Sequence, residues 1–180
     1  GVPLSLLQMT KNHTLGIIEA GISMPGEMDH LQEMIKPDYG ILTHIGTAHS
    51  ENFPSIEAIS VEKSKLFKNN IKQYSYLENE SIIKSINKAV STTEIILKWQ
   101  DDVFSFSIPF IDDASIKNAI TTIGFLLKFD VSNELITTEA PHLPPIALRL
   151  EARKGRDQNI IINDSYSNDI DSLTIALNYI

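Results

Sequence analysis

Short apolar runs and segments of helical spacing alternate along the first half of the chain. Residues 15–22 (LGIIEAGI) and 39–46 (YGILTHIG) are nearly continuous apolar runs, as strands buried on both faces are. Between them, the apolar residues of 25–36 recur at helical spacing, and Pro37 ends that pattern. A further helix follows, with Ser55 as its N-cap. The first half therefore predicts strand, helix, strand and helix in turn.

The second half continues the alternation. YSYL (74–77) and EIILKW (94–99) read as strands around a helix at about 81–90, and FSFSIPF (104–110) reads as an edge strand because Pro109 cannot donate to a ladder. A helix with an Asp cap is predicted over 113–129, then a linker into a strand (142–155), a strand running into a polar turn (159–169) and a last helix. The pattern predicts an α/β fold with a mainly parallel sheet flanked by helices.

Composition narrows the classes of protein. The 180 residues are 42% hydrophobic and 21% charged, which is typical of a soluble globular chain. The net charge of −8 and the absence of a Lys/Arg cluster argue against nucleic-acid binding. Without cysteine there are no disulfides and no thiolate metal sites. No apolar run reaches the roughly 18 residues of a membrane span, and no signal peptide is visible.

Both ends of the sequence look like the inside of helices. The chain opens on GVPLSLLQM, without an initiating Met, and ends on SLTIALNYI, an amphipathic stretch without a cap. These ends predict a piece cut from a longer protein.

Three side chains with metal or acid–base chemistry follow consecutive predicted elements. Glu19 lies near the carboxyl end of the first strand, His49 follows the second, and Lys63 lies on the apolar face of the next helix, four residues from both Ile59 and Phe67. Ligands of α/β proteins bind at the carboxyl ends of the strands, so the three are expected to converge. Taken singly, each has a plainer interpretation: a strand-end carboxylate, a loop histidine, and a lysine whose ammonium reaches water.

Four segments together resemble the Mur ligases of peptidoglycan synthesis. They are IIEAGISMPGEMDHL, PDYGILTHIGTAHSENFPSIEAISVEKSKLF, LRLE and INDSYSND. Within the family, the sequence is most similar to members that add D-alanyl-D-alanine to UDP-N-acetylmuramoyl tripeptide, in particular the form fused to an alanine racemase. The resemblance implies a P-loop-type central ATP-binding domain over 1–145, truncated at its N-terminal side, and the hinge and start of the C-terminal domain over 146–180.

The resemblance also implies the reaction. Such enzymes are cytoplasmic amide ligases that use ATP and two Mg²⁺ ions to convert the tripeptide carboxylate into an acyl phosphate, which the amine of D-alanyl-D-alanine then attacks. Pyridoxal phosphate is implied only if a racemase domain is fused downstream. The phosphate loop G-x-x-x-x-G-K-S/T occurs nowhere in the sequence, and the resemblance places it just before residue 1. We therefore expect the chain alone to be inactive.

Residue by residue, the resemblance implies two groups of functional side chains. Lys63, carbamylated by CO₂, and His49 match the catalytic residues and, with Glu19, the metal ligands. Asn118 matches a residue that contacts adenine, Arg149 one that reaches the ATP phosphates, and Asp164 one that holds the ribose or the hinge. Lys65 is expected to point elsewhere and to be solvated.

The sequence departs from the family pattern at several positions. His44 stands where Asn is more common, Ser167 replaces the usual Asn, and Ala114 and Ser115 stand where His-Asn is usual. Two alternatives remain: another Mur or folate-adding ligase with the same metal site, or a non-catalytic α/β binding domain that retains these residues as remnants.

Overall fold

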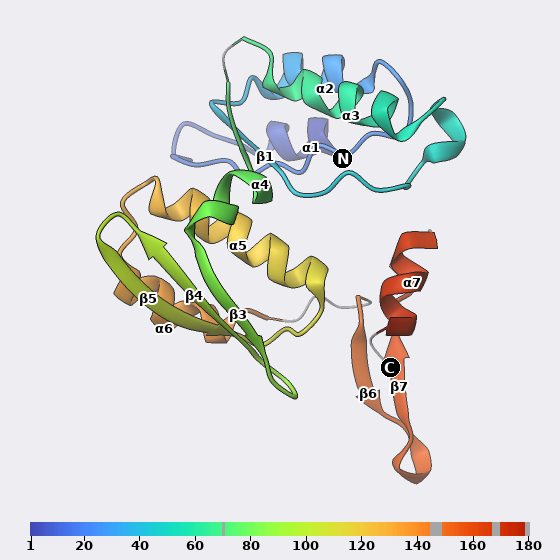
Figure 1. The fold of residues 1–180 in the computed structure, drawn as a ribbon. Coiled ribbons are helices and arrows are strands. Elements are labelled where there is room, and N and C mark those ends of the chain that lie inside the picture. Colours follow the sequence, from blue (N-terminus) through green and yellow to red (C-terminus); the bar gives the residue numbers. More distant parts are fainter. Residues whose placement is uncertain (70, 145–148, 167–169, 179–180) are drawn as a thin grey trace. The chain divides into compact units, whose positions relative to one another are not determined.

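The computed structural model describes residues 1–69, 71–144, 149–166 and 170–178, and the chain divides into two compact units, 1–73 and 74–180 (Figure 1). Each unit has its own hydrophobic core. Across the described ranges, none of the helices is long and apolar enough to cross a membrane.

Unit 1 packs helices over a small core. Its elements are α1 (Val2–Leu7), α2 (Glu27–Ile35), β1 (Tyr39–Leu42), the 3₁₀ turn η1 (Ser50–Asn52), α3 (Ile56–Ser64) and the 3₁₀ turn η2 (Lys65–Phe67). β1 pairs in a two-stranded sheet with β2 (Lys72–Ser75), where the chain passes into unit 2. The core is formed by Ile22, Met28, Phe53 and Ile59. Ser55 caps α3 as predicted, accepting a hydrogen bond from the Ala58 N–H at 3.2 Å.

Residues 15–22 are not a strand, so this prediction is wrong. The segment is irregular, and Leu15 and Ile17 are 73% and 89% exposed. An extended segment becomes a strand only by hydrogen bonding to a neighbour, and none of the sheets in the described residues includes this one. Ile22, at its end, does enter the core of unit 1. Glu19 therefore lies on an irregular segment rather than at a strand end.

Unit 2 contains two antiparallel sheets, which the sequence pattern did not predict. The sheets are β3–β4–β5 and β6–β7. The elements are α4 (Tyr76–Asn79), η3 (Glu80–Ile82), β3 (Ile83–Lys88), β4 (Thr93–Trp99), β5 (Asp102–Ile108), α5 (Asp113–Leu127), α6 (Asn133–Glu139), η4 (Ala140–His142), β6 (Glu151–Lys154), η5 (Arg156–Gln158), β7 (Ile160–Asn163) and α7 (Ile170–Asn178).

A helix was predicted at about 81–90, and the structure has the strand β3 there instead. β3 pairs antiparallel with β4, and Ile86 lies opposite Ile95. The strands are joined by a tight turn in which the Ala89 N–H donates to the Thr92 carbonyl at 2.8 Å. Isoleucine is favoured in strands because its branched side chain packs well on a pleated surface, and pairing with β4 satisfies the backbone.

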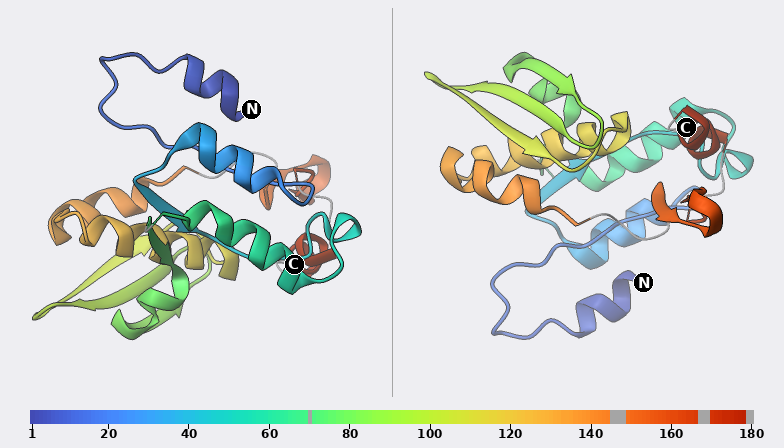
Figure 2. Two further views of the ribbon diagram at one scale, coloured as in Figure 1. Left: turned by 90° about the horizontal axis from the view of Figure 1, so that it is seen from above. Right: turned by 90° about the horizontal axis from the view of Figure 1, so that it is seen from below.

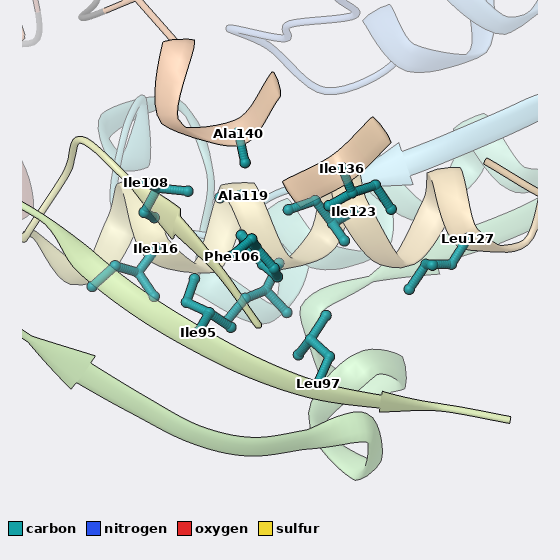
Figure 3. Packing of buried hydrophobic residues seen from close by; sticks show 11 residues of the cluster. Ile95, Leu97, Phe106, Ile108, Ile116, Ala119, Ile123, Leu127, Ile136 and Ala140 are labelled. Carbon is teal, nitrogen blue, oxygen red and sulfur yellow. The ribbon is translucent and has the colours of Figure 1, made fainter. Parts of the chain in front are cut away.

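The core of unit 2 lies between the three-stranded sheet and the helices α5 and α6, which cover the same face of it (Figure 2). Alternate residues of β4 point inward, so Ile95 and Leu97 are fully buried against α5 (Figure 3). α5 has an Asp cap as predicted, but the capping residue is Asp112, one position before the predicted range, and its Oδ1 accepts from the Ser115 N–H at 2.7 Å. β5 is an edge strand, as predicted, but it ends at Ile108, just before Pro109, rather than at residue 110.

Gly124→Ala should destabilise unit 2, although alanine normally favours a helix by about 1 kcal/mol over glycine. A Cβ at Gly124 would overlap the amide group of the buried Asn79, whose Nδ2 donates to the Ser75 carbonyl at 3.3 Å. We expect a loss of about 1–3 kcal/mol in urea unfolding. Gly21→Ala, which meets no neighbouring atom within 4 Å, is the matched control. Equal stability of the two variants would contradict this packing.

Candidate functional site

The three residues predicted to bind nucleotide line one pocket of unit 2. This pocket has a volume of about 860 Å³, and Asn118 of α5, Arg149 and Asp164 all contribute to its wall. The β3–β4 turn, most of the length of α5, the α6–η4 segment, β6 and α7 also contribute lining residues. Residues separated by as many as 46 positions of sequence, from 118 to 164, therefore face the same space.

Asp164 holds the backbone beside Arg149. Its Oδ1 accepts a hydrogen bond from the Leu150 N–H at 3.1 Å, and Leu150 has a φ of +46°, a conformation that non-glycine residues rarely adopt. The guanidinium of Arg149 lies over the ring of Tyr166, 4.5 Å from its centre. Tyr166 was not among the predicted site residues, although it stands in the same INDSYSND motif as Asp164. These contacts favour the hinge role for Asp164.

The lining of the pocket combines apolar surface with polar groups, which include the carboxylates of Asp112, Glu139, Glu151 and Asp164. Phe110, Ile111 and Leu143 supply flat apolar area, and Asn118 supplies an amide that both donates and accepts. Among its described lining residues, Arg149 is the single Lys or Arg, and its planar fork of N–H donors suits phosphate. A concave pocket that combines apolar surface with convergent polar groups is typical of small-molecule sites.

Lys63, in unit 1, lies on α3 and is half-buried. Its Nζ donates to the backbone carbonyl of His44 at 3.1 Å. Burial lowers the pKa of its ammonium group below the ordinary value of 10.5, because a charged amine loses hydration in a low-dielectric environment. A lysine that deprotonates more readily is a better nucleophile, which suits the predicted attack on CO₂.

Glu19 and His49 are both exposed. His49 immediately precedes η1 and has a φ of +62°; its side chain is 48% exposed, and its Nδ1 lies 3.9 Å from Glu51 Oε1. The contacts of His49 and Lys63 thus go to Glu51 and His44, and no group of three or more His, Asp or Glu side chains in the described residues is arranged to hold a metal ion. The metal-binding roles of Glu19, His49 and Lys63 stay predictions.

Lys65 is partly exposed, with 28% of its side chain accessible, but it is held in ion pairs, which was not expected. Its Nζ forms ion pairs with Glu62 at 2.6 Å and with Asp29 at 2.8 Å, and Lys68 also pairs with Asp29. Glu62 is buried and also accepts hydrogen bonds from the N–H groups of Gly26 and Met28. We call Glu62, Lys65, Asp29 and Lys68 the Glu62 network. Helical spacing alone could not reveal it, because its partners at α2, the donating Gly26 and Met28 N–H groups and the accepting Asp29 carboxylate, are more than 30 residues away.

The Glu62 network should make unit 1 less stable in acid. Hydrogen bonds from Lys65 and Lys68 hold the pKa of Asp29 at about 2, below the ordinary 3.8. Burial raises the pKa of Glu62, but hydrogen bonds from Lys65 and two backbone N–H groups outweigh it and keep that pKa below 4.5. Lowered pKa values stabilise the fold above the unfolded-state pKa, and this contribution is lost as the pH falls through the folded-state value.

We therefore expect the melting temperature of unit 1 to fall between about pH 4.5 and pH 2. Asp29→Asn should reduce this fall, because the variant has one fewer carboxylate to protonate. Calorimetric melting of both proteins across that range checks the prediction. Identical pH profiles would contradict it.

Comparison with known proteins places the chain in a family. Residues 1–108 match the model of the Mur ligase middle domain. Two curated relatives are named UDP-N-acetylmuramoyl-tripeptide–D-alanyl-D-alanine ligase. The protein from Borreliella burgdorferi is 28% identical and is matched over 100% of this chain and 44% of its own length. The protein from Buchnera aphidicola is 24% identical over 98% of this chain and 45% of its own length. The chain thus spans less than half of either relative.

Solved structures show the same fold. MurF from Acinetobacter baumannii superposes with a TM-score of 0.85 and 21% identity over 99% of this chain and 45% of that one. MurF from Thermotoga maritima, in complex with ADP, gives a TM-score of 0.70 and 16% identity over 87% of this chain and 42% of that one. The predicted α/β class is confirmed by these neighbours. With its family match over 1–108, the chain belongs to the Mur ligase family.

Proposed function

We propose that this chain is part of an ATP-dependent ligase that joins D-alanyl-D-alanine to UDP-N-acetylmuramoyl tripeptide in the cytoplasm. The relatives carry that name, and the family match covers more than half of the chain. The observation that carries the proposal is the pocket of unit 2, in which Asn118, Arg149 and Asp164 share one wall. Domain boundaries at 1–145 and 146–180 are part of the same proposal.

In this proposal the unit 2 pocket binds ATP. The apolar wall takes the flat base, and the Asn118 amide can both donate to and accept from the edge of adenine. Arg149 reaches the phosphates through charge-assisted hydrogen bonds. Asp164 keeps the Arg149 segment in place through its bond to the Leu150 N–H. The ADP complex of the Thermotoga maritima relative supports a nucleotide as the ligand.

The metal site in this proposal is built by Glu19, His49 and carbamylated Lys63. The donors fit in chemistry: Glu19 offers the carboxylate oxygens that Mg²⁺ prefers, and a carbamate would add two more. Bound Mg²⁺ would neutralise charge on the transferring phosphoryl group. The half-buried amine of Lys63 favours carbamate formation, because its pKa is lowered by burial. The His44 carbonyl at 3.1 Å holds this amine in place before it reacts.

Two other functions fit the same residues. Another Mur or folate-adding ligase would share the nucleotide pocket but take a different carboxylate and amine. A non-catalytic domain would keep the fold and lose the reaction. The apolar pocket with Arg149 favours a ligase of some kind, and the names of the relatives favour D-alanyl-D-alanine as the amine.

The test is a ligation assay on the full-length protein. It should form the pentapeptide product, identified by mass, only when ATP, Mg²⁺, the tripeptide and D-alanyl-D-alanine are all present. Replacing both substrates tests the other ligases: a shorter UDP-N-acetylmuramoyl precursor is paired with L-alanine, D-glutamate or a diamino acid, and a folate is paired with glutamate. If product forms only with one of these alternative substrate pairs, the protein is the corresponding ligase. If no pair supports ATP turnover, the non-catalytic domain is favoured.

A further inference from the structure

The N-terminus of α2 lacks a local cap. Its N-cap residue is Gly26, in the left-handed region at φ +88°, with no side chain to accept hydrogen bonds from the first turn. Instead, Glu62 Oε1 from α3 accepts from the Gly26 N–H at 2.8 Å and the Met28 N–H at 3.2 Å. A carboxylate at this end is also favoured by the helix dipole. Glu62 therefore caps a helix that lies 36 residues earlier in the sequence.

A second polar link joins the same two helices. The Oε2 of Glu62 pairs with Lys65 at 2.6 Å, and Lys65 reaches Asp29 of α2 at 2.8 Å. Glu62 is 5% exposed, so its removal would leave two backbone N–H groups and part of the Lys65 charge without partners. The C-terminal end of α3 is thus fixed to the start of α2 by buried and half-buried polar contacts.

Lys63 is the next residue of the same helical turn. Its Nζ meets the His44 carbonyl at 3.1 Å, on the segment after β1. A hydrogen bond weakens steeply once its atoms separate beyond about 3.5 Å, so a shift of α3 by a fraction of a turn would lose this contact. The orientation of the Lys63 amine therefore depends on where α3 sits relative to α2.

We propose that Glu62 is a positioning residue for Lys63: by capping α2 and pairing with Lys65, it fixes α3 so that the Lys63 amine is held beside the His44 carbonyl. This inference rests on the proposed function, which gives Lys63 its part in the reaction. Glu62 touches neither nucleotide nor substrate in this role. Its effect appears in turnover rather than in ATP binding, because the nucleotide pocket is formed by unit 2.

The experiment compares three variants of the full-length enzyme. Glu62→Ala removes both links, and Glu62→Gln keeps an acceptor for the Gly26 and Met28 N–H groups but loses the charge. Leu31→Ala is the matched control, since Leu31 of α2 packs on the same core and takes no part in the Glu62 network. For each we measure the melting temperature, kcat, KM for ATP, and hydrogen exchange of the Gly26 and Met28 amides.

Glu62→Ala should lose amide protection and at least about tenfold in kcat, because small misplacements of reacting groups are costly, with KM for ATP within about twofold. Glu62→Gln should keep the protection and lie between Glu62→Ala and the wild type in kcat. Leu31→Ala should lower the melting temperature with kcat within about twofold. If Glu62→Ala does not fold, the comparison rests on Glu62→Gln, and the proposal then requires its kcat to be lower than that of Leu31→Ala.

Three distinguishable results would overturn the proposal. If the wild type ligates and the Glu62 variants lose no more kcat than Leu31→Ala, Glu62 is a structural residue only. If the wild type does not ligate, the proposed function fails and the positioning role fails with it. Retained protection of Gly26 and Met28 in Glu62→Ala would contradict the capping contact itself.

Discussion

Lys63→Ala in the full-length enzyme should remove most ligase activity, with a fall in kcat of at least about a hundredfold, while the protein stays folded. The substitution deletes a proposed metal-binding carbamate rather than a large packing group. Lys63 is half-buried, and its one described hydrogen bond goes to the exposed residue His44, so little packing is lost. Steady-state kinetics at saturating ATP, together with circular dichroism, measure both parts of this prediction.

Acetate should restore part of the activity of Lys63→Ala, because a small carboxylate can occupy the vacated anionic position. The matched control is Lys72→Ala, which removes an exposed lysine of β2 and should leave kcat within about twofold. Lys65→Ala is unsuitable as a control, since it breaks the Glu62 network and should lower stability. Wild-type turnover by Lys63→Ala at low magnesium would show that Lys63 is a surface lysine whose stem lies along apolar groups.

Arg149→Ala should raise KM for ATP by about ten- to a hundredfold, since a hydrogen bond between charged groups contributes about 1.5–3 kcal/mol. Arg149→Lys should recover only part of this, because an ammonium lacks the planar fork that binds phosphate oxygens in pairs. Among the described residues of the pocket wall no other Lys or Arg can compensate. Initial rates measured against ATP concentration give KM for the wild type and for both variants.

The control for Arg149 is Arg153→Ala. Arg153 lies on the β6–β7 hairpin, is 61% exposed and pairs at 2.7 Å with Glu151, which lines the pocket, so its loss removes the same positive charge without removing an arginine of the pocket wall. Exposed ion pairs contribute little, so KM should change less than about twofold. An equal rise in KM for both variants would mean that net charge, and not the site, attracts ATP.

The sequence predicted correctly those helix starts that depend on hydrogen bonds between residues close together in the chain. Ser55 and Asp112 mark the starts of α3 and α5 because their side chains bond to N–H groups three residues on. The strand at 94–99 is within β4. The predictions were wrong where strand pairing with distant residues determines the structure. Residues 15–22 have the composition of a strand but pair with no strand in the described part of the chain. Residues 81–90 have helical spacing, but most of them form β3, which pairs with β4. Helix α6 was not predicted, since it was too short to show a periodic pattern.

In the candidate site, too, the contacts between residues far apart in the sequence were the ones that could not be predicted from its pattern. The resemblance indicated Asn118, Arg149 and Asp164, and all three line one pocket; their roles in binding nucleotide stay predictions. The capping of α2 by Glu62 could not be predicted, because the sequence around Gly26 carries no signal for a hydrogen-bond acceptor 36 residues later. Lys65 looked solvated for the same reason: its acceptor Asp29 lies on another helix. Long-range polar contacts leave no periodic trace in a sequence.

The distant cap of α2 has a consequence for how unit 1 acquires its structure. A helix of nine residues is too short to persist alone in water, and α2 has no polar cap of its own. While the chain is being synthesised, α2 emerges well before the carboxylate that completes its first turn. We therefore expect α2 to stay largely unformed until α3 closes the intervening loop, so that the two helices gain order in a single cooperative step.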